Sequence, residues 1–389
     1  MSAAAFAPSA ATRPLRLALL GSRGIPAQYG GYETLMEELG PRLVDRGHDV
    51  TVYCRSHVVP RELAEHRGCR LVVLPTIRTK HLDTPVHTLL STLHAGERPF
   101  DAALVVNSAN AMFVPLLRAA DIPVALHVDG IEHRRAKWGA LGRSVYAISE
   151  RLAVRVADEM ITDAEVIARH YAVRYGASTT TITYGVEAER EPGDDALRRL
   201  GLESGRYLLY VSRFEPENNP HRVAEAYRSV PGTTPLVMVG DAPYARSFID
   251  GFVRGADPRI LFPGGLYGRE YRQLQHHALA YVHATEVGGT HPALVEAMGY
   301  GNCVVVNDTP ENREVAGPVG LYFEAARPET LAVLLTGLLA DPSTAADLGR
   351  RSAARAAERY SWDSIAGQYD EVFRRLATGK ARPGYGRAT

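Results

Sequence analysis

The sequence has few cysteines and no excess of charge of either sign, and each absence excludes a class of protein. Its 389 residues include three cysteines, Cys54, Cys69 and Cys303, which are widely spaced and form no CxxC pair. This set predicts neither a disulfide framework nor a structural zinc site. The 44 basic and 44 acidic residues cancel. A dedicated nucleic-acid-binding protein usually carries a marked basic excess, so we expect no nucleic-acid partner.

Long hydrophobic runs are also absent. No segment reaches the roughly 18 consecutive apolar residues of a membrane-spanning helix, and the most apolar region, residues 102–117, is interrupted by two asparagines and a serine. Residues 1–14 lack the continuous apolar core of a signal peptide and are expected to form a disordered leader. The Gly/Arg/Pro-rich residues 378–389 are expected to form a disordered tail. We therefore expect a cytoplasmic protein, and peripheral attachment at the inner face of a membrane stays open.

What the sequence does contain is an alternation of strand and helix patterns. Residues 15–20 form a short apolar run typical of a buried parallel strand. Residues 32–46 have leucines and a methionine at helical spacing, and residues 49–54 resume a strand pattern. This is a βαβ unit, and several similar units follow it.

The pattern starts again after a polar, Gly/Pro-bearing segment, residues 188–200, which we expect to be a linker. Open parallel sheets with helices on both faces follow from such alternation. We therefore predict an α/β fold with two Rossmann-like domains, residues 15–187 and 201–362, facing each other across a deep cleft. Ligands of such sheets bind beyond the carboxyl ends of the strands.

The segment TEVGGTHPALVEAMGYG, residues 285–301, predicts a phosphate site at the start of a helix. Gly288 and Gly289 have no Cβ, so an anion can approach the backbone closely. Thr290 or His291 can cap the helix, and the proline that follows suits its first turn. The first amides of a helix lack intrahelical acceptors and carry the positive end of the helix dipole.

Glu296 falls about one and a half turns into this predicted helix. A carboxylate so close to a phosphate would repel it, so we expect Glu296 to accept hydrogen bonds from the hydroxyls of a ribose. The alternative is a capped structural helix with an exposed glutamate.

The loop SRGIPAQYGGYE follows the first strand and enters a helix through Gly30 and Gly31. Its glycines do not form GxGxxG, so a nicotinamide-binding site is poorly supported. The spacing suits a longer loop that reaches across the cleft toward a diphosphate or a sugar. A plain glycine-rich turn is the alternative.

Arg213, in VSRFEPENNP, follows the first strand of the second half. A diphosphate would lie at the carboxyl end of that strand, and the planar guanidinium is suited to binding phosphate. The alternative is an ordinary surface arginine.

The segment HVDGIEHRRAKWG follows a strand of the first half. Its acidic and imidazole groups could handle acceptor hydroxyls, whereas its basic and aromatic groups could meet anionic lipid head groups. A solvated basic helix start is the alternative. The acidic and imidazole groups are His127, Asp129, Glu132 and His133, and the basic and aromatic groups are Arg134, Arg135, Lys137 and Trp138.

Taken together, these motifs resemble the GT-B-fold glycosyltransferases of family 4. The resemblance extends from about Leu15 to Ala377, and it is carried by GSRGIPAQYGGYETLMEEL, VDGIEHRRAKW, RFEPENN and GGTHPALVEAM in the same order. These segments are similar to a bacterial rhamnosyltransferase-like branch with a distinctive N-terminal domain. The resemblance implies sugar transfer from a nucleotide-diphosphate donor with retention at the anomeric carbon. It also implies no obligatory metal, no cofactor besides the donor substrate, and a final helix, residues 363–377, that crosses back onto the first domain.

The chain departs from the family pattern at three places. Family members usually carry Glu-x7-Glu; Glu296 matches the second glutamate, Gly288 stands at the first position, and Glu286 lies two residues earlier. Asn218 stands five residues after the arginine, where a lysine is usual. Asp129 stands where many members have a histidine, and His127 is displaced by two residues.

The resemblance implies a set of site residues and a range of substrates. The donor is dTDP-rhamnose or a UDP-sugar, and the acceptor is a saccharide, a lipid-linked saccharide or a small molecule. Alternatives are a GT-B nucleotide-sugar epimerase or a non-catalytic subunit that binds a nucleotide sugar or a lipid. The expected catalytic residues are Arg213, Asp129, His127 and Glu286, and the expected donor-binding residues are Gly30, Gly31, Arg213, Asn218, Gly288, Gly289, Thr290, His291 and Glu296.

Overall fold

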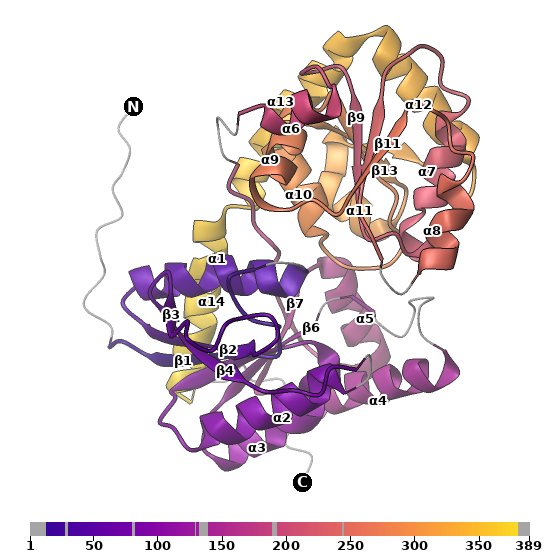
Figure 1. The fold of residues 1–389 in the computed structure, drawn as a ribbon. Helices are drawn as coiled ribbons and strands as arrows, with labels where there is room; N and C mark the ends of the chain where they lie inside the picture. The colour runs from indigo at the N-terminus through magenta and orange to yellow at the C-terminus, as the bar shows by residue number, and fades with distance from the viewer. Residues whose placement is uncertain are drawn as a thin grey trace.

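Two sheets of mostly parallel strands, each covered by helices on both faces, form two domains (Figure 1). The computed structural model describes residues 13–27, 30–79, 82–128, 130–131, 139–188, 193–242 and 245–379. The predicted α/β fold with two facing Rossmann-like domains is confirmed.

The first domain contains an eight-stranded sheet in the order β3-β4-β2-β1-β5-β6-β7-β8. Its neighbours pair in parallel except for β3 and β4. The strands are β1 (Arg16–Leu20), β2 (Asp49–Arg55), β3 (Glu65–His66), β4 (Cys69–Leu74), β5 (Ala102–Val106), β6 (Val124–Val128), β7 (Glu159–Thr162) and β8 (Thr180–Thr181).

Two apolar layers flank this sheet. One is formed with α1 (Gly31–Asp45), and the other with α2 (Asp83–Gly96), η1 (Ser108–Phe113), α3 (Val114–Ala119), α4 (Ala140–Val156) and α5 (Glu165–Tyr175). The central strands β1, β5 and β6 are buried on both faces, which is why they read as continuous apolar runs in the sequence.

The second domain contains a six-stranded parallel sheet in the order β11-β10-β9-β12-β13-β14. The strands are β9 (Leu208–Val211), β10 (Leu236–Val239), β11 (Ile260–Gly264), β12 (Ala280–His283), β13 (Cys303–Asn307) and β14 (Leu321–Phe323). The helices are α6 (Asp195–Leu200), η3 (Pro216–Asn218), α7 (Pro220–Tyr227), α8 (Arg246–Val253), α9 (Gly268–His277), α10 (Pro292–Gly299), α11 (Pro310–Ala316), η4 (Gly317–Val319), α12 (Pro328–Ala340) and α13 (Pro342–Arg359).

Part of the segment expected to be a linker is helical. Residues 195–200 form α6, and its Ala196 and Leu197 are buried in the core of the second domain. Gly201 ends the helix in the left-handed conformation, with φ of 66°. The polar composition of this segment reflects the exposed face of a short helix rather than an unstructured connection.

The last helix, α14 (Trp362–Ala377), leaves the second domain and returns to the first. Figure 1 shows it in yellow beside α1. Its apolar residues, including Ile365, Tyr369 and Phe373, lie in the core of the first domain. Trp362 is buried where the chain crosses, and a Cβ on Gly185 would lie 2.6 Å from its ring. The glycine therefore allows the two connections between the domains to lie side by side.

Within the described ranges, no single helix is long and apolar enough to cross a membrane; α12 and α13 meet the criterion only as a pair that is bent by 103°. The three cysteines are free and buried.

Candidate active site

A cavity of about 470 Å3 lies between the two domains, at the carboxyl ends of their strands. The first domain contributes the start of α1, and residues 185–187 contribute the edge where the chain passes between the domains. The second domain contributes the loops after β9, β10 and β11 and the exposed sides of α9 and α10. Four of the predicted donor-binding residues line this cavity: Gly30, Gly31, Arg213 and Glu296.

The two glycines at the start of α1 have different surroundings: Gly30 lies against Glu33 of the same helix, and Gly31 lies near the second domain. Gly30 has φ of 111°, and a Cβ there would lie 2.3 Å from Oε2 of Glu33. A Cβ on Gly31 would lie 3.5 Å from Cγ of Pro292, at the start of α10. Glu33 holds the loop in place because its Oε1 accepts the backbone N–H of Arg23 at 2.8 Å. Burial raises the pKa of the Glu33 carboxyl above its usual value.

Glu296 lies on the opposite wall, on the side of α10 that faces the cavity. The phenol of Tyr271, on α9, donates a hydrogen bond to its Oε2, and Nε2 of Gln275 donates to the Tyr271 oxygen at 3.0 Å. Burial raises the pKa of Glu296 to about 7, opposed by the bond from Tyr271 and supported by the nearby carboxylate of Glu38. Glu296 is therefore close to half-ionised at neutral pH.

Arg213 follows β9 and reaches the cavity with a side chain that is 36% exposed. Its Nη1 lies 3.6 Å from Oε1 of Glu215. Asn218 does not line the cavity; it is buried, and its Nδ2 donates to the carbonyl oxygen of Arg213 at 2.7 Å. The residue that replaces the usual lysine therefore fixes the backbone of the arginine loop.

The glycine loop before α10 contacts a carboxylate of the first domain. Asp163, directly after β7, accepts the backbone N–H of Thr290 at 2.9 Å with its Oδ2, and its carbonyl oxygen accepts the Thr290 hydroxyl at 2.6 Å. A Cβ on Gly289 would lie 2.0 Å from Oδ1 of Asp163. The predicted capping is wrong: His291 occupies the N-cap position without a side-chain capping bond, and Thr290 bonds to Asp163 instead.

Gly288 stands where the family usually has a glutamate, and the structure gives a steric reason. A Cβ at this position would lie 2.2 Å from Cε1 of His291. On the other side, a Cβ on Gly130 of the first domain would lie 3.1 Å from Cα of Gly288. A larger residue at Gly288 would have to displace the imidazole. Gly288, Gly289, Thr290 and His291 are outside the lining of the cavity.

Two of the expected catalytic residues also lie away from the cavity lining. Glu286 is exposed, and its Oε1 accepts a hydrogen bond from Nδ2 of Asn219 at 2.9 Å. His127, at the end of β6, is buried, and its Nδ1 lies 2.8 Å from the hydroxyl of Tyr369 on α14. Burial lowers the pKa of His127 to about 3, so its ring is neutral at physiological pH. Asp129 and the segment 132–138 lie outside the described residues.

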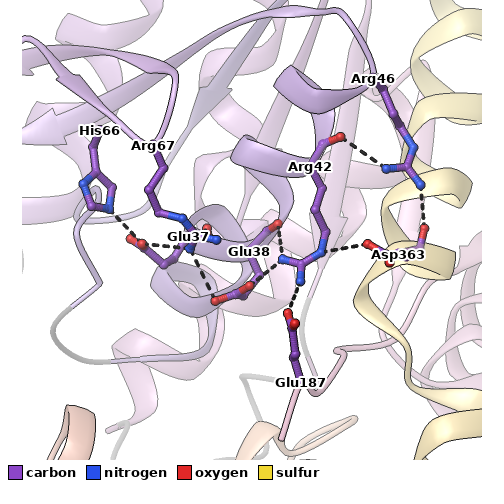
Figure 2. Close-up of polar contacts among 8 residues, drawn as sticks. All are labelled: Glu37, Glu38, Arg42, Arg46, His66, Arg67, Glu187 and Asp363. Atoms are coloured by element: carbon purple, nitrogen blue, oxygen red, sulfur yellow. Dashed lines mark hydrogen bonds and ion pairs between the residues drawn. The ribbon is translucent and has the colours of Figure 1, made fainter. Parts of the chain in front are cut away.

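Beside the cavity, Arg42 joins three parts of the chain. Figure 2 shows its guanidinium pointing toward Glu38, Glu187 and Asp363. Nη1 lies 2.5 Å from Oε2 of Glu38 on the same helix, Nη2 pairs with Glu187 in the segment between the domains, and Nε lies 3.2 Å from Oδ1 of Asp363 on α14. The Arg42 side chain is only 12% exposed. It therefore ties α1 to both connections between the domains.

Sequence reasoning missed several residues of the cavity and its closure. Tyr271, Arg272 and Glu38 line the cavity from helices, and nothing in their local sequence separates them from ordinary polar helix positions. Asp163 had a usable signal, because it is an acidic residue directly after a buried parallel strand.

Two Rossmann-like domains that close on a cavity at their strand ends, with the last helix returning to the first domain, are the architecture of GT-B glycosyltransferases. Residues 30–185 match the glycosyl transferase 4-like domain family, and residues 195–355 match the glycosyl transferases group 1 family. The chain therefore contains one domain of each family and is a glycosyltransferase.

Curated relatives and solved structures agree with this assignment. The chain is 25% identical to the alpha-maltose-1-phosphate synthase of Mycolicibacterium smegmatis, over 93% of this chain and 100% of that protein. It is also 25% identical to the GDP-mannose-dependent alpha-(1-6)-phosphatidylinositol monomannoside mannosyltransferase of the same organism, over 91% and 97% of the two chains.

Among solved structures, the sucrose-phosphate synthase of Thermosynechococcus elongatus aligns with a TM-score of 0.81 at 21% identity, over 94% of this chain and 100% of that chain. The HepE protein of Anabaena, in complex with UDP-glucose, aligns with a TM-score of 0.75 at 17% identity, over 92% and 99% of the two chains. At these identities the structural likeness shows the fold.

Proposed function

We propose that this glycosyltransferase moves a sugar from a nucleotide-diphosphate donor to a hydroxyl acceptor, with retention at the anomeric carbon and without a metal ion. The observation that carries the proposal is that Arg213 and Glu296 line one cavity between the domains. Glu296 accepts hydrogen bonds from the ribose of the nucleotide. Arg213 meets the diphosphate, which gains negative charge as the bond to the sugar breaks, and a fixed cation at that position lowers the barrier.

The acceptor side is formed by the first domain, at Gly30 and Gly31. Closure of the two domains excludes water and so limits hydrolysis of the donor. Because His127 and Glu286 do not line the cavity, we give neither of them a part at the reacting atoms.

We infer that the donor is a UDP-sugar or dTDP-rhamnose and that the acceptor is a saccharide or a lipid-linked saccharide. The UDP-glucose complex of HepE supports a uridine donor, and the rhamnosyltransferase-like motifs of the N-terminal half support dTDP-rhamnose. The name of the mannosyltransferase relative, which acts on a phosphatidylinositol monomannoside, supports a lipid-linked acceptor.

A thermal-shift screen of the whole chain against UDP, dTDP, GDP, ADP and NAD tests the proposal. A ligand at 100 times its dissociation constant adds about 2.7 kcal/mol to the free energy of unfolding, so one nucleoside diphosphate should raise the melting temperature clearly. Stabilisation by NAD and by none of the diphosphates would refute the donor class.

The reaction itself is tested by release of the nucleoside diphosphate from the donor that the screen identifies. Release that depends on an added acceptor supports transfer. Conversion of the donor sugar without any acceptor would instead indicate an epimerase, and binding without release would indicate a non-catalytic subunit.

A further inference from the structure

Helix α2 has its polar face inside and its apolar face outside. Leu82, Leu89 and Leu93 are 45%, 37% and 51% exposed, and Val86 completes their stripe at helical spacing. A helix of a soluble domain normally buries such a stripe against its own core. The reversed orientation therefore leaves an apolar surface that the fold itself does not cover.

The inward face of α2 is polar, and part of it is hydrogen-bonded within the helix. The buried hydroxyls of Ser91 and Thr92 donate to the carbonyl oxygens of His87 and Thr88, one turn earlier in the same helix. Burial lowers the pKa of His87 to about 4, so no charge is buried there at neutral pH. The inward face of α2 therefore carries no charge, and its leucines remain on the outside.

The apolar surface continues onto the neighbouring helices. Met112 of η1 and Leu116 of α3 are 59% and 41% exposed, and Val145 and Ile148 of α4 are 49% and 60% exposed. α2 contacts α3 and η1, and η1 contacts α4. Figure 1 shows α2 and α3 on the side of the first domain away from the second. We name this surface the α2–α4 face; its apolar members are Leu82, Val86, Leu89, Leu93, Met112, Leu116, Val145 and Ile148.

The elements that form the α2–α4 face carry more exposed cations than exposed anions, although the chain as a whole is formally neutral; one of the cations, Arg118, pairs with Asp158 at 3.3 Å. Over residues 77–79, 82–121 and 139–156 the exposed anions are Glu97 and Asp121. The exposed cations over the same residues are Arg78, Arg98, Arg118, Arg143, Arg151 and Arg155. On α4, Ile148, Arg151 and Arg155 share one stripe at helical spacing, so apolar and cationic side chains alternate on the same surface.

We propose that the α2–α4 face docks on an anionic membrane surface. Leucines that enter the boundary between head groups and acyl chains, with arginines reaching the phosphates, are the combination that holds an amphipathic helix in a membrane interface. A second copy of the chain is a poorer partner, because a symmetric contact would bring these arginines against one another. Docking is a property of the surface and goes beyond the proposed transfer reaction, although it would keep the enzyme near a lipid-linked acceptor.

Flotation of the full chain with phosphatidylcholine vesicles, prepared with and without phosphatidylglycerol, tests the proposal. The wild-type chain should float with the anionic vesicles, and added salt should weaken this binding. The double variant Leu89→Glu/Leu93→Glu should bind at least about tenfold more weakly for each leucine lost. Because both leucines are exposed, the variant should keep the melting curve of the wild-type chain.

The matched control is Val333→Glu, which places the same charge at a side chain that is 69% exposed on α12 of the second domain. It should float as the wild-type chain does. A second double variant, Arg151→Glu/Arg155→Glu, should lose the preference for anionic vesicles.

Equal flotation of the wild-type chain and the leucine variant would overturn the proposal, as would no flotation of either. Light scattering without lipid measures the oligomeric state of both proteins. If the wild-type chain is a dimer and the leucine variant is a monomer, the α2–α4 face binds a second copy of the chain instead of a membrane. The assay uses no donor or acceptor, so its failure is distinct from a failure of the proposed reaction.

Discussion

Glu296→Gln should make the protein more stable at alkaline pH while weakening its binding of nucleotide. The substitution keeps the size of the side chain and an oxygen that can accept the hydrogen bond of Tyr271, but it removes the ionisable group. A glutamate that only stabilised the fold would not combine a gain in stability with a loss of affinity.

The magnitude follows from the environment of the carboxyl. Burial raises the pKa of Glu296 from 4.5 to about 7, and each pKa unit corresponds to about 1.4 kcal/mol. Between these two values the folded protein binds more protons than the unfolded chain, so this group lowers the free energy of unfolding as the pH rises through the window. Since Glu296 is partly exposed to the cavity, we expect the variant to be more stable by about 2 kcal/mol at pH 8, and by less than about 1 kcal/mol at pH 5.

Urea denaturation at the two pH values measures this difference, and Glu358→Gln, at an exposed position of α13, is the control that should show none. In parallel, the dissociation constant for the nucleoside diphosphate should rise by about tenfold, because a neutral amide is a weaker acceptor than a carboxylate. The reasoning is refuted if the stability difference between wild type and variant is the same at both pH values.

Three further perturbations address the rest of the site. Arg213→Ala should reduce kcat by at least about 100-fold without lowering the melting temperature, because a cation that meets the leaving group is lost; near-normal turnover would remove it from the diphosphate. Gly289→Ala, whose Cβ would lie 2.0 Å from a carboxylate oxygen, should lower the free energy of unfolding by about 1–3 kcal/mol. The control is Gly251→Ala, in α8, where no atom lies within 4 Å of the new Cβ; it should raise the free energy of unfolding by up to about 1 kcal/mol. Urea denaturation compares the two variants. Equal changes in the free energy of unfolding would contradict the close approach of the two domains at Gly289. Arg42→Ala should cost about 1 kcal/mol, mainly through the lost contact with the partly buried Glu38, because Glu187 and Asp363 are 74% and 82% exposed and remain solvated. Arg350→Ala, at a side chain that is 72% exposed, should change the same measurement by less than about 0.5 kcal/mol.

The architecture could be predicted because each element is amphipathic or apolar over its own length. The helix expected over residues 32–46 is observed as α1 (Gly31–Asp45), and the one after the second glycine loop as α10 (Pro292–Gly299). Short elements were harder: α6 has six residues, and β8 only two. Their formation depends on packing against distant parts of the chain, which periodicity does not record.

Some residues of the cavity could also be predicted from the sequence, and others could not. Gly30, Gly31 and Arg213 could be placed because they follow strands whose carboxyl ends face the cleft, and Glu296 because it follows such a loop by a known number of helical residues. Sequence spacing gives the position of a residue along a strand, loop or helix, but it does not give the direction of its side chain. Glu286 and His127 lie close to the right strand ends, yet one points to the surface and the other into the core.

The contacts that close the cleft were beyond local sequence reasoning, because each joins a carboxylate of one domain to backbone N–H groups of the other. Asp163 of the first domain accepts the N–H of Thr290, 127 residues away. In the reverse sense, Glu314 on α11 of the second domain accepts the N–H groups of Glu165 and Val166, at the start of α5, at 2.7 and 2.9 Å. The loop before α10 and the start of α5 are thus already met by protein carboxylates.

The consequence concerns where the diphosphate binds. With the Thr290 amide bonded to Asp163, an anion near Gly289 would compete with a carboxylate that belongs to the protein, and the two negative charges would repel each other. On the other side of the cavity, Arg213 supplies a cation, and its Nη1 lies 3.6 Å from Oε1 of Glu215. The glycine loop thus serves the contact between the domains, and we propose that the donor phosphates bind at the other end of the cleft, at the arginine loop.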